Sequence, residues 1–108
     1  MNTELTQHID VVKGDLVRMT QLVGSAMNRA TQALLDADLA MAEAVIAADA
    51  QIDILASDVE EQCLDAIAQD TPGRDEIPEL IGALRIAASL ERMGDLAEHV
   101  AKQSRLRY

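Results

Sequence analysis

The stretch LTQHIDVVKGDLVRMTQLVGSAMNRATQA, residues 5–33, decides the fold of this chain. Its apolar residues recur at intervals that alternate between four and three positions, which is the spacing of one face of an α-helix. No proline interrupts the stretch, and Gly14 and Gly24 weaken a helix only modestly. The sequence therefore predicts one long amphipathic helix over about residues 4–35, with an apolar face made of Leu5, Ile9, Val12, Leu16, Met19, Val23, Ala26, Ala30 and Ala33.

A second helix is predicted over about residues 39–69. Asp38 stands where the first apolar face fades, and aspartate is a preferred residue at a helix N-cap. The segment DTPGRD, residues 70–75, then combines proline, glycine and short polar residues, and so predicts a loop. The expected core face of this second helix is Val45, Ala48, Ile52, Leu55, Val59, Cys63 and Ala66.

A third helix is predicted over about residues 76–106. Pro78 lies in its first turn, where a missing backbone N–H costs little. We expect one apolar stripe to face the core, and it consists of Ile86, Leu90, Met93, Ala97 and Val100.

The composition supports an all-α fold. The chain has 108 residues with one Tyr and no Phe or Trp, whereas sheet proteins draw on aromatic and β-branched side chains. Three helices of similar length joined by short loops predict an antiparallel three-helix bundle of the up-down-up, spectrin-like type, forming one domain over residues 1–108. Three alanine-rich helices cannot bury every apolar stripe among themselves. We therefore expect an exposed apolar side that pairs in a homodimer.

Charge and targeting signals narrow the partners and the location. The net charge of −10 argues against DNA or RNA as a partner, because nucleic-acid affinity depends on neutralising phosphates with Lys and Arg. The N-terminal residues lack the pattern of a secretory signal, and no apolar run approaches the ~20 residues of a membrane span. The lone Cys63 cannot form an internal disulfide. We expect a cytoplasmic protein without membrane insertion.

Carboxylates interrupt the apolar faces of the second and third helices at matching heights. Asp49 and Asp53 lie one turn apart, and so do Glu91 and Asp95. An antiparallel hairpin that folds back near residues 72–73 places Asp49 level with Asp95, and Asp53 level with Glu91. The sequence therefore predicts that four carboxylates gather at one level of the bundle.

Four facing carboxylates repel one another unless a cation neutralises them. Oxygen ligands suit Mg²⁺, Ca²⁺, Mn²⁺ and iron, and Zn²⁺ also accepts carboxylates, so the pattern does not identify the metal. The predicted metal ligands are Asp49, Asp53, Glu91 and Asp95. The alternative is that all four lie on a solvated face, where Arg92 or a lysine neutralises them.

Catalytic signatures are not found in the sequence. It has no glycine-rich phosphate loop, no G-x-S-x-G, no HExxH and no Cys-x-x-Cys. The E-x-x-H spacing typical of helical di-iron enzymes is missing from the two carboxylate-bearing helices. We therefore predict that this protein is not an enzyme.

The stretch LERMGDLA, residues 90–97, resembles a motif of the PhoU family of phosphate-uptake regulators. Two further stretches support the resemblance: ALLDADLA, residues 33–40, is similar to the family's first helix-to-helix junction, and DAQID, residues 49–53, to a D-x-x-x-D segment of its second helix. The resemblance covers nearly the whole chain, and its ERMGD element is the most specific part.

The resemblance implies a fold built from three-helix repeats and a regulatory role. The family's acidic segments are associated with bound metal clusters, and by position they carry over to Asp49 and Asp53 and to Glu91 and Asp95. Family members act as adaptors of a phosphate ABC transporter and a sensor histidine kinase, damping phosphate uptake and phosphate-starvation signalling. They usually hold two repeats where this chain has room for one, so either a homodimer replaces the second repeat, or the chain is a fragment or a stand-alone relative. Two alternatives remain open: a helical carboxylate metal-binding protein, and a plain helical oligomerisation module.

Overall fold

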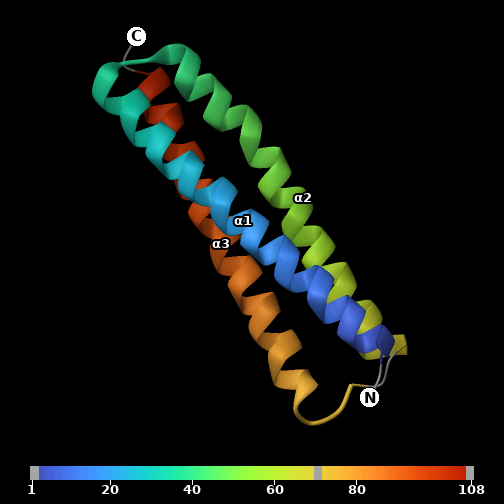
Figure 1. Ribbon diagram of the computed structural model, residues 1–108. Helices are drawn as coiled ribbons and strands as arrows, with labels where there is room; N and C mark the ends of the chain where they lie inside the picture. Colours follow the sequence, from blue (N-terminus) through green and yellow to red (C-terminus); the bar gives the residue numbers. More distant parts are fainter. Residues whose placement is uncertain (1–2, 70–71, 107–108) are drawn as a thin grey trace.

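The computed structural model describes residues 3–69 and 72–106, and these residues form three long helices without any strand. The helices are α1 (Thr3–Asp36), α2 (Leu39–Gln69) and α3 (Glu76–Arg105). They lie side by side in a rod that measures 56 × 16 × 16 Å (Figure 1). The predicted all-α bundle of three helices is therefore confirmed. None of the described helices is both long and apolar enough to cross a membrane.

The helices run up, down and up again, and each packs against the other two. One end of the rod is marked by His8 of α1, whose Nδ1 lies 2.8 Å from Oε1 of Gln62 on α2. At the opposite end, the buried Ser104 of α3 donates a hydrogen bond of 2.8 Å from its Oγ to the carbonyl oxygen of Ala33 on α1. Thus α1 is antiparallel to α2 and parallel to α3.

A tight turn joins α1 to α2. Ala37 adopts a left-handed conformation with φ of 52°, and the N–H of Asp38 donates to the carbonyl oxygen of Ala33 at 2.9 Å. This is the usual way in which a helix C-terminus satisfies its last carbonyl groups. Asp38 then caps α2 as predicted, because its Oδ1 accepts a hydrogen bond of 3.0 Å from the N–H of Met41.

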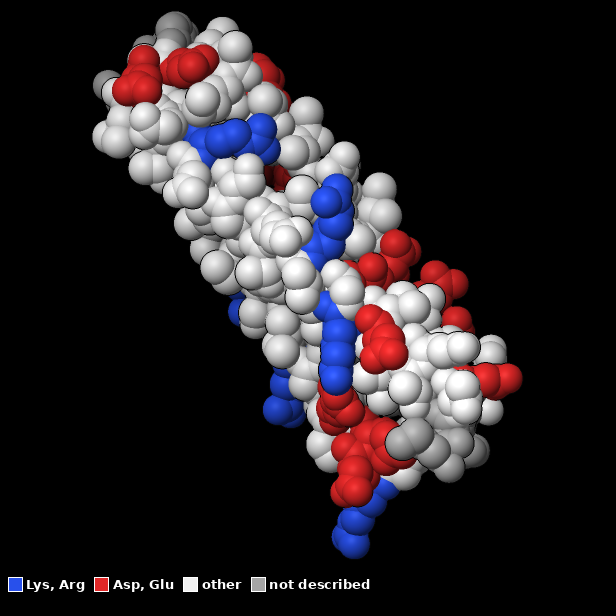
Figure 2. All heavy atoms as spheres, in the orientation of Figure 1, with Lys and Arg blue, Asp and Glu red and all other residues white. Residues whose placement is uncertain are grey.

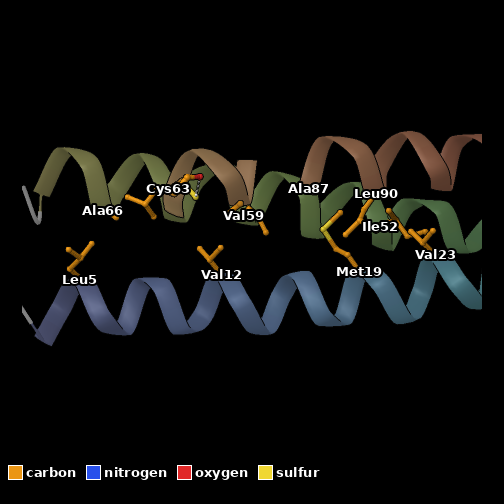
Figure 3. Packing of buried hydrophobic residues seen from close by; sticks show 12 residues of the cluster. Leu5, Val12, Met19, Val23, Ile52, Val59, Cys63, Ala66, Ala87 and Leu90 are labelled. Carbon is orange, nitrogen blue, oxygen red and sulfur yellow. Dashed lines mark hydrogen bonds between the residues drawn. The ribbon is translucent and has the colours of Figure 1, made fainter. Parts of the chain in front are cut away.

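The core divides into a half with large side chains and a half with small ones. Near the α2–α3 loop, the α1 side chains point toward those of α2 and α3 (Figure 3), and the cluster includes Leu5, Val12, Met19, Val23, Ile52, Val59, Cys63, Leu80 and Leu90. At the α1–α2 turn the core is almost entirely alanine: Ala26, Ala30, Ala33, Ala42, Val45, Ala97 and Ala101. Small side chains allow helix backbones to approach closely.

The predicted core faces of α1 and α2 are confirmed, since every residue of both stripes is buried or half-buried. The prediction for α3 was wrong in part. Its core face is a row of small residues with two leucines: Leu80, Ala83, Ala87, Leu90, Gly94, Ala97, Ala101 and Ser104. Ile86 and Met93, which we expected to be buried, are 50% and 44% exposed. Because α3 packs closely against the other helices, small side chains occupy its core face. The prediction relied on hydrophobicity alone and therefore selected a neighbouring stripe of larger apolar residues.

Candidate metal centre

The carboxylates from α2 and α3 meet at the middle of the bundle. Asp49, Asp53 and Asp95 each direct one carboxylate oxygen to a common place, where the three oxygens lie within 4.8 Å of one another. The antiparallel course of the two helices produces this meeting, because it sets the middle of α2 beside the middle of α3. Oxygens that share one metal ion at 2.0 to 2.6 Å are separated by similar distances. The geometry is therefore compatible with a single cation held by three carboxylates.

Asp49 is the buried member of this group. Its side chain is 7% exposed, and its Oδ1 atom has no hydrogen-bond partner among the described residues. A buried polar atom without a partner costs free energy. Burial raises the pKa of Asp49 to about 7, with further contributions from a hydrogen bond to Glu98 and from the charges of Asp53, Glu98 and Asp95. Asp49 therefore brings a buried and unpartnered oxygen to the group of carboxylates.

Glu91 is the fourth residue that the sequence singled out, and it lies beside the group. It is half-buried and contacts Asp53 through a side-chain hydrogen bond. Burial raises the pKa of Glu91, and the negative charges of Asp53, Asp95 and Glu60 raise it further. The structure therefore brings Asp49, Asp53 and Asp95 together and places Glu91 next to Asp53.

Glu98 is a further carboxylate at this level, and it was not among the four predicted metal ligands. It forms a hydrogen bond with Asp49. Its Oε1 also forms an ion pair of 2.7 Å with Nζ of Lys102. The hydrogen bond from Lys102 lowers the pKa of Glu98, and the hydrogen bond from Asp49 lowers it as well. A charged Glu98 beside a protonated Asp49 satisfies both shifts. Its position three residues after Asp95, on the same face of α3, was the signal that pointed to it.

The backbone of α3 comes very close to the buried aspartate. A Cβ placed on Gly94 would lie 3.2 Å from Oδ1 of Asp49 and 3.1 Å from Cδ1 of Ile52. Both distances are tighter than most side-chain contacts in proteins. Gly94 therefore leaves room for the Asp49 carboxylate between the two helices.

Arginine does not neutralise the group in the described part of the chain. The ion pairs there join Lys13 to Glu79, Lys102 to Glu98 and Arg105 to Glu43, and none involves Asp49, Asp53, Glu91 or Asp95. Arg92, which could have served as an internal counter-ion, is exposed. Among the described residues, no positive side chain therefore pairs with these four carboxylates.

Comparison with known proteins gives two kinds of match. The family model described as the PhoU domain matches residues 16–104. The chain is 41% identical over 108 residues to the phosphate-specific transport system accessory protein PhoU homolog 1 of Mycobacterium tuberculosis (strain ATCC 25618 / H37Rv), which covers 100% of this chain and 49% of that protein. It is 35% identical over 101 residues to the PhoU homolog of Aquifex aeolicus (strain VF5), covering 94% of this chain and 46% of that protein. The chain thus spans about half the length of the curated relatives it matches.

Proposed function

This chain belongs to the PhoU domain family, and from that premise we propose that it is a non-enzymatic accessory regulator of phosphate transport. The observation that carries the proposal is the match along the entire chain to proteins named as phosphate-specific transport system accessory proteins. In this proposal the protein acts in the cytoplasm on a phosphate ABC transporter and a sensor histidine kinase. It damps phosphate uptake and the phosphate-starvation response when phosphate is plentiful.

An adaptor role is consistent with the chemistry of the side chains. Cys63 is the chain's one cysteine, and its thiol is buried and lies 3.8 Å from the carbonyl oxygen of Leu80. Burial raises the pKa of the Cys63 thiol, which keeps it in the unreactive protonated form. The outer surface of α2 suits a basic partner surface, since Leu39–Gln69 contains no lysine or arginine.

The regulatory proposal is tested in cells that lack this protein. A reporter of the phosphate-starvation response should rise in phosphate-rich medium when the protein is absent, and a plasmid copy should return the reporter to its repressed level. Phosphate uptake should follow the same course. If the reporter responds normally to phosphate in cells without the protein, the proposed regulatory role is wrong.

The proposal includes a metal ion at the carboxylates of α2 and α3. Asp49, Asp53 and Asp95 would supply the first ligands, and Glu91 lies close enough to Asp53 to join them. The support comes from the unpartnered Oδ1 of Asp49 and from the lack of a positive side chain paired with these carboxylates in the described ranges. Such an ion would link α2 to α3 and offset the repulsion among the carboxylates. Mg²⁺, Ca²⁺, Mn²⁺, iron and Zn²⁺ all accept such ligands.

A thermal melt of chelator-treated protein tests this metal site. A cation at 100 times its dissociation constant should stabilise the fold by about 2.7 kcal/mol. The combined variant Asp49→Asn, Asp53→Asn, Glu91→Gln and Asp95→Asn should lose this response. A matched control removes four exposed carboxylates elsewhere, with the changes Asp10→Asn, Asp58→Asn, Glu61→Gln and Asp75→Asn. If no cation moves the wild-type midpoint, or if the control loses the response equally, the site is not a metal centre.

The proposed assembly is a homodimer. Several large apolar side chains are exposed along the rod, as expected for a protein that buries them against a partner.

A further inference from the structure

The side of α2 that faces away from the bundle carries apolar residues, although the outer side of a surface helix is normally charged and polar. Exposed residues recur there at intervals that alternate between three and four, the spacing of one helix face. We call them the outer α2 stripe: Ala47, Ala50, Ile54, Ser57, Glu61 and Leu64. Ile54 and Leu64 are 60% and 55% exposed. Much of their apolar surface therefore meets water when the chain is alone.

Two open hollows border this stripe. The hollow beside Ile54 measures about 210 Å³, and its other lining residues are Arg18, Leu22, Gln51 and Leu55. The hollow beside Leu64 measures about 220 Å³, and its other lining residues are Ser57, Glu60 and Glu61. The first can receive an apolar side chain between its leucines. The second can receive a lysine or arginine, whose aliphatic stem would lie on Leu64 while its charge meets the two glutamates.

Carboxylates border the stripe on both sides. Toward α1, Asp58 lies near Asp15, whose pKa is raised by burial and by the charge of Asp58. Toward α3, Glu60 and Glu91 line one hollow. The helix Leu39–Gln69 itself contains no lysine or arginine, and Figure 2 shows acidic side chains along the edge of the rod where α2 lies. The outer α2 stripe is therefore an apolar strip between two acidic borders.

We propose that the outer α2 stripe binds a basic amphipathic helix of a partner protein. This inference rests on the proposed accessory role and specifies the chemistry of the partner. The stripe from Ala47 to Leu64 is about 26 Å long, which gives room for roughly five turns of a second helix. The two alanines allow the backbone of that helix to come close, and Ile54 and Leu64 offer it apolar contacts. Lysines and arginines on either side of the partner's apolar stripe would then face the acidic borders.

The charges favour this partner over other occupants of the stripe. A second copy that packed its α2 against this one would set carboxylates against carboxylates, because the charged residues of α2 are all acidic. Nucleic acid would be repelled for the same reason. An acidic or uncharged helix would cover Ile54 and Leu64 but would leave the borders without opposite charge. A basic amphipathic helix satisfies both the apolar strip and its acidic borders.

A synthetic helix tests the inference. The probe is a fluorescent peptide of about 18 residues, with leucines along one face and lysines on both sides of them. Fluorescence anisotropy measures its dissociation constant for the full chain, and circular dichroism checks that each variant keeps its helices. Ile54→Ser and Glu61→Lys should each weaken binding at least about tenfold. The matched controls Ile86→Ser, at a 50% exposed isoleucine of α3, and Asp10→Lys, at an exposed residue of α1, should change it by less than about twofold.

Changed peptides separate this binding from general attraction to an acidic protein. A peptide with serine in place of each leucine should bind at least about tenfold more weakly, and a peptide with glutamate in place of each lysine should not bind. No binding of the lysine–leucine peptide at about 100 μM, or equal weakening by the stripe variants and their controls, would overturn the inference. Self-association of the chain that Ile54→Ser abolishes would place a second copy on the stripe and overturn it too. The phosphate reporter decides the accessory role separately, so its result stands whichever way the peptide behaves.

Discussion

At the scale of single residues, Asp49 has the most unusual environment in the chain. It is a buried carboxylate on α2, and other carboxylates surround it: Asp53 on the same helix and Asp95 and Glu98 on α3. Burial and these negative neighbours favour its protonated form and raise its pKa to about 7. Near neutral pH, the chain without a cation therefore holds a proton at the place where the proposed metal would bind.

This raised pKa predicts that stability without metal falls as the pH rises. The unfolded chain releases the Asp49 proton near its ordinary pKa of 3.8, whereas the folded chain keeps it until about pH 7. Between these values the folded state binds more protons, so each rise in pH lowers the free energy of unfolding. The stabilisation of the folded state by the Asp49 proton is complete below about pH 3.8, and it is lost as the pH rises through about 7.

Asp49→Asn should remove most of this slope. In the presence of a chelator, urea unfolding at pH 5 and pH 8 should show a smaller loss of stability in the variant than in the wild type. The exposed change Asp10→Asn serves as the control and should keep the wild-type slope. A wild-type protein that gains stability between pH 5 and pH 8, with Asp49→Asn following the same course, would contradict the environment described for Asp49.

At the scale of elements, the contact between α2 and α3 depends on one glycine. Gly94 is buried, and a Cβ at this position would press on both Ile52 and Asp49 of α2. Ile52 is almost fully buried, so it has little room to move. The close approach of the two helices here both fills the core and presents Asp49 to Asp95.

Gly94→Ala and Gly14→Ala should therefore change stability in opposite directions. Gly14 has open space around it, so alanine there should add about 0.5 to 1 kcal/mol through its helix propensity. Gly94→Ala should instead destabilise by roughly 1 kcal/mol, because overpacking outweighs that gain. It should also shrink the stabilisation by cations, since it displaces the Asp49 carboxylate. Chemical unfolding of both variants measures the difference, and a Gly94→Ala protein more stable than wild type with its full cation response would refute this account.

At the scale of the whole molecule, the three sides of the rod differ in chemistry. The meeting of α2 and α3 carries the carboxylate group, the charged residues of α2 are all acidic, and a hollow between α1 and α3 is lined mostly by apolar residues. This division is consistent with the proposals that one side binds a cation and another meets a basic partner.

The proposed homodimer predicts a melting midpoint that depends on protein concentration. Dissociation accompanies the unfolding of a dimer, so mass action raises the midpoint as the concentration increases. Scanning calorimetry of the wild type between about 5 and 500 μM should show this rise. A midpoint independent of concentration in the wild type would argue for a folded monomer.

Most of the fold follows from local patterns along the chain. The four-three spacing of apolar residues predicted α1 and its core face, and Asp38 predicted the start of α2. Because two helices joined by a short loop must run antiparallel, the positions of Asp49, Asp53, Glu91 and Asp95 also predicted that the carboxylates would meet. These properties depend on residues near one another in sequence or on simple hairpin geometry.

The tertiary structure decided what depends on how closely the helices approach. It selected the small residues of α3 for the core and left Ile86 and Met93 partly exposed. It buried Asp49 against Gly94, and it placed Glu98 between Asp49 and Lys102. The periodicity of a sequence identifies an apolar face to within about one stripe, but the distance between backbones determines which stripe is buried. That distance depends on how the side chains of all three helices pack together, so the sequence pattern of one helix does not determine it.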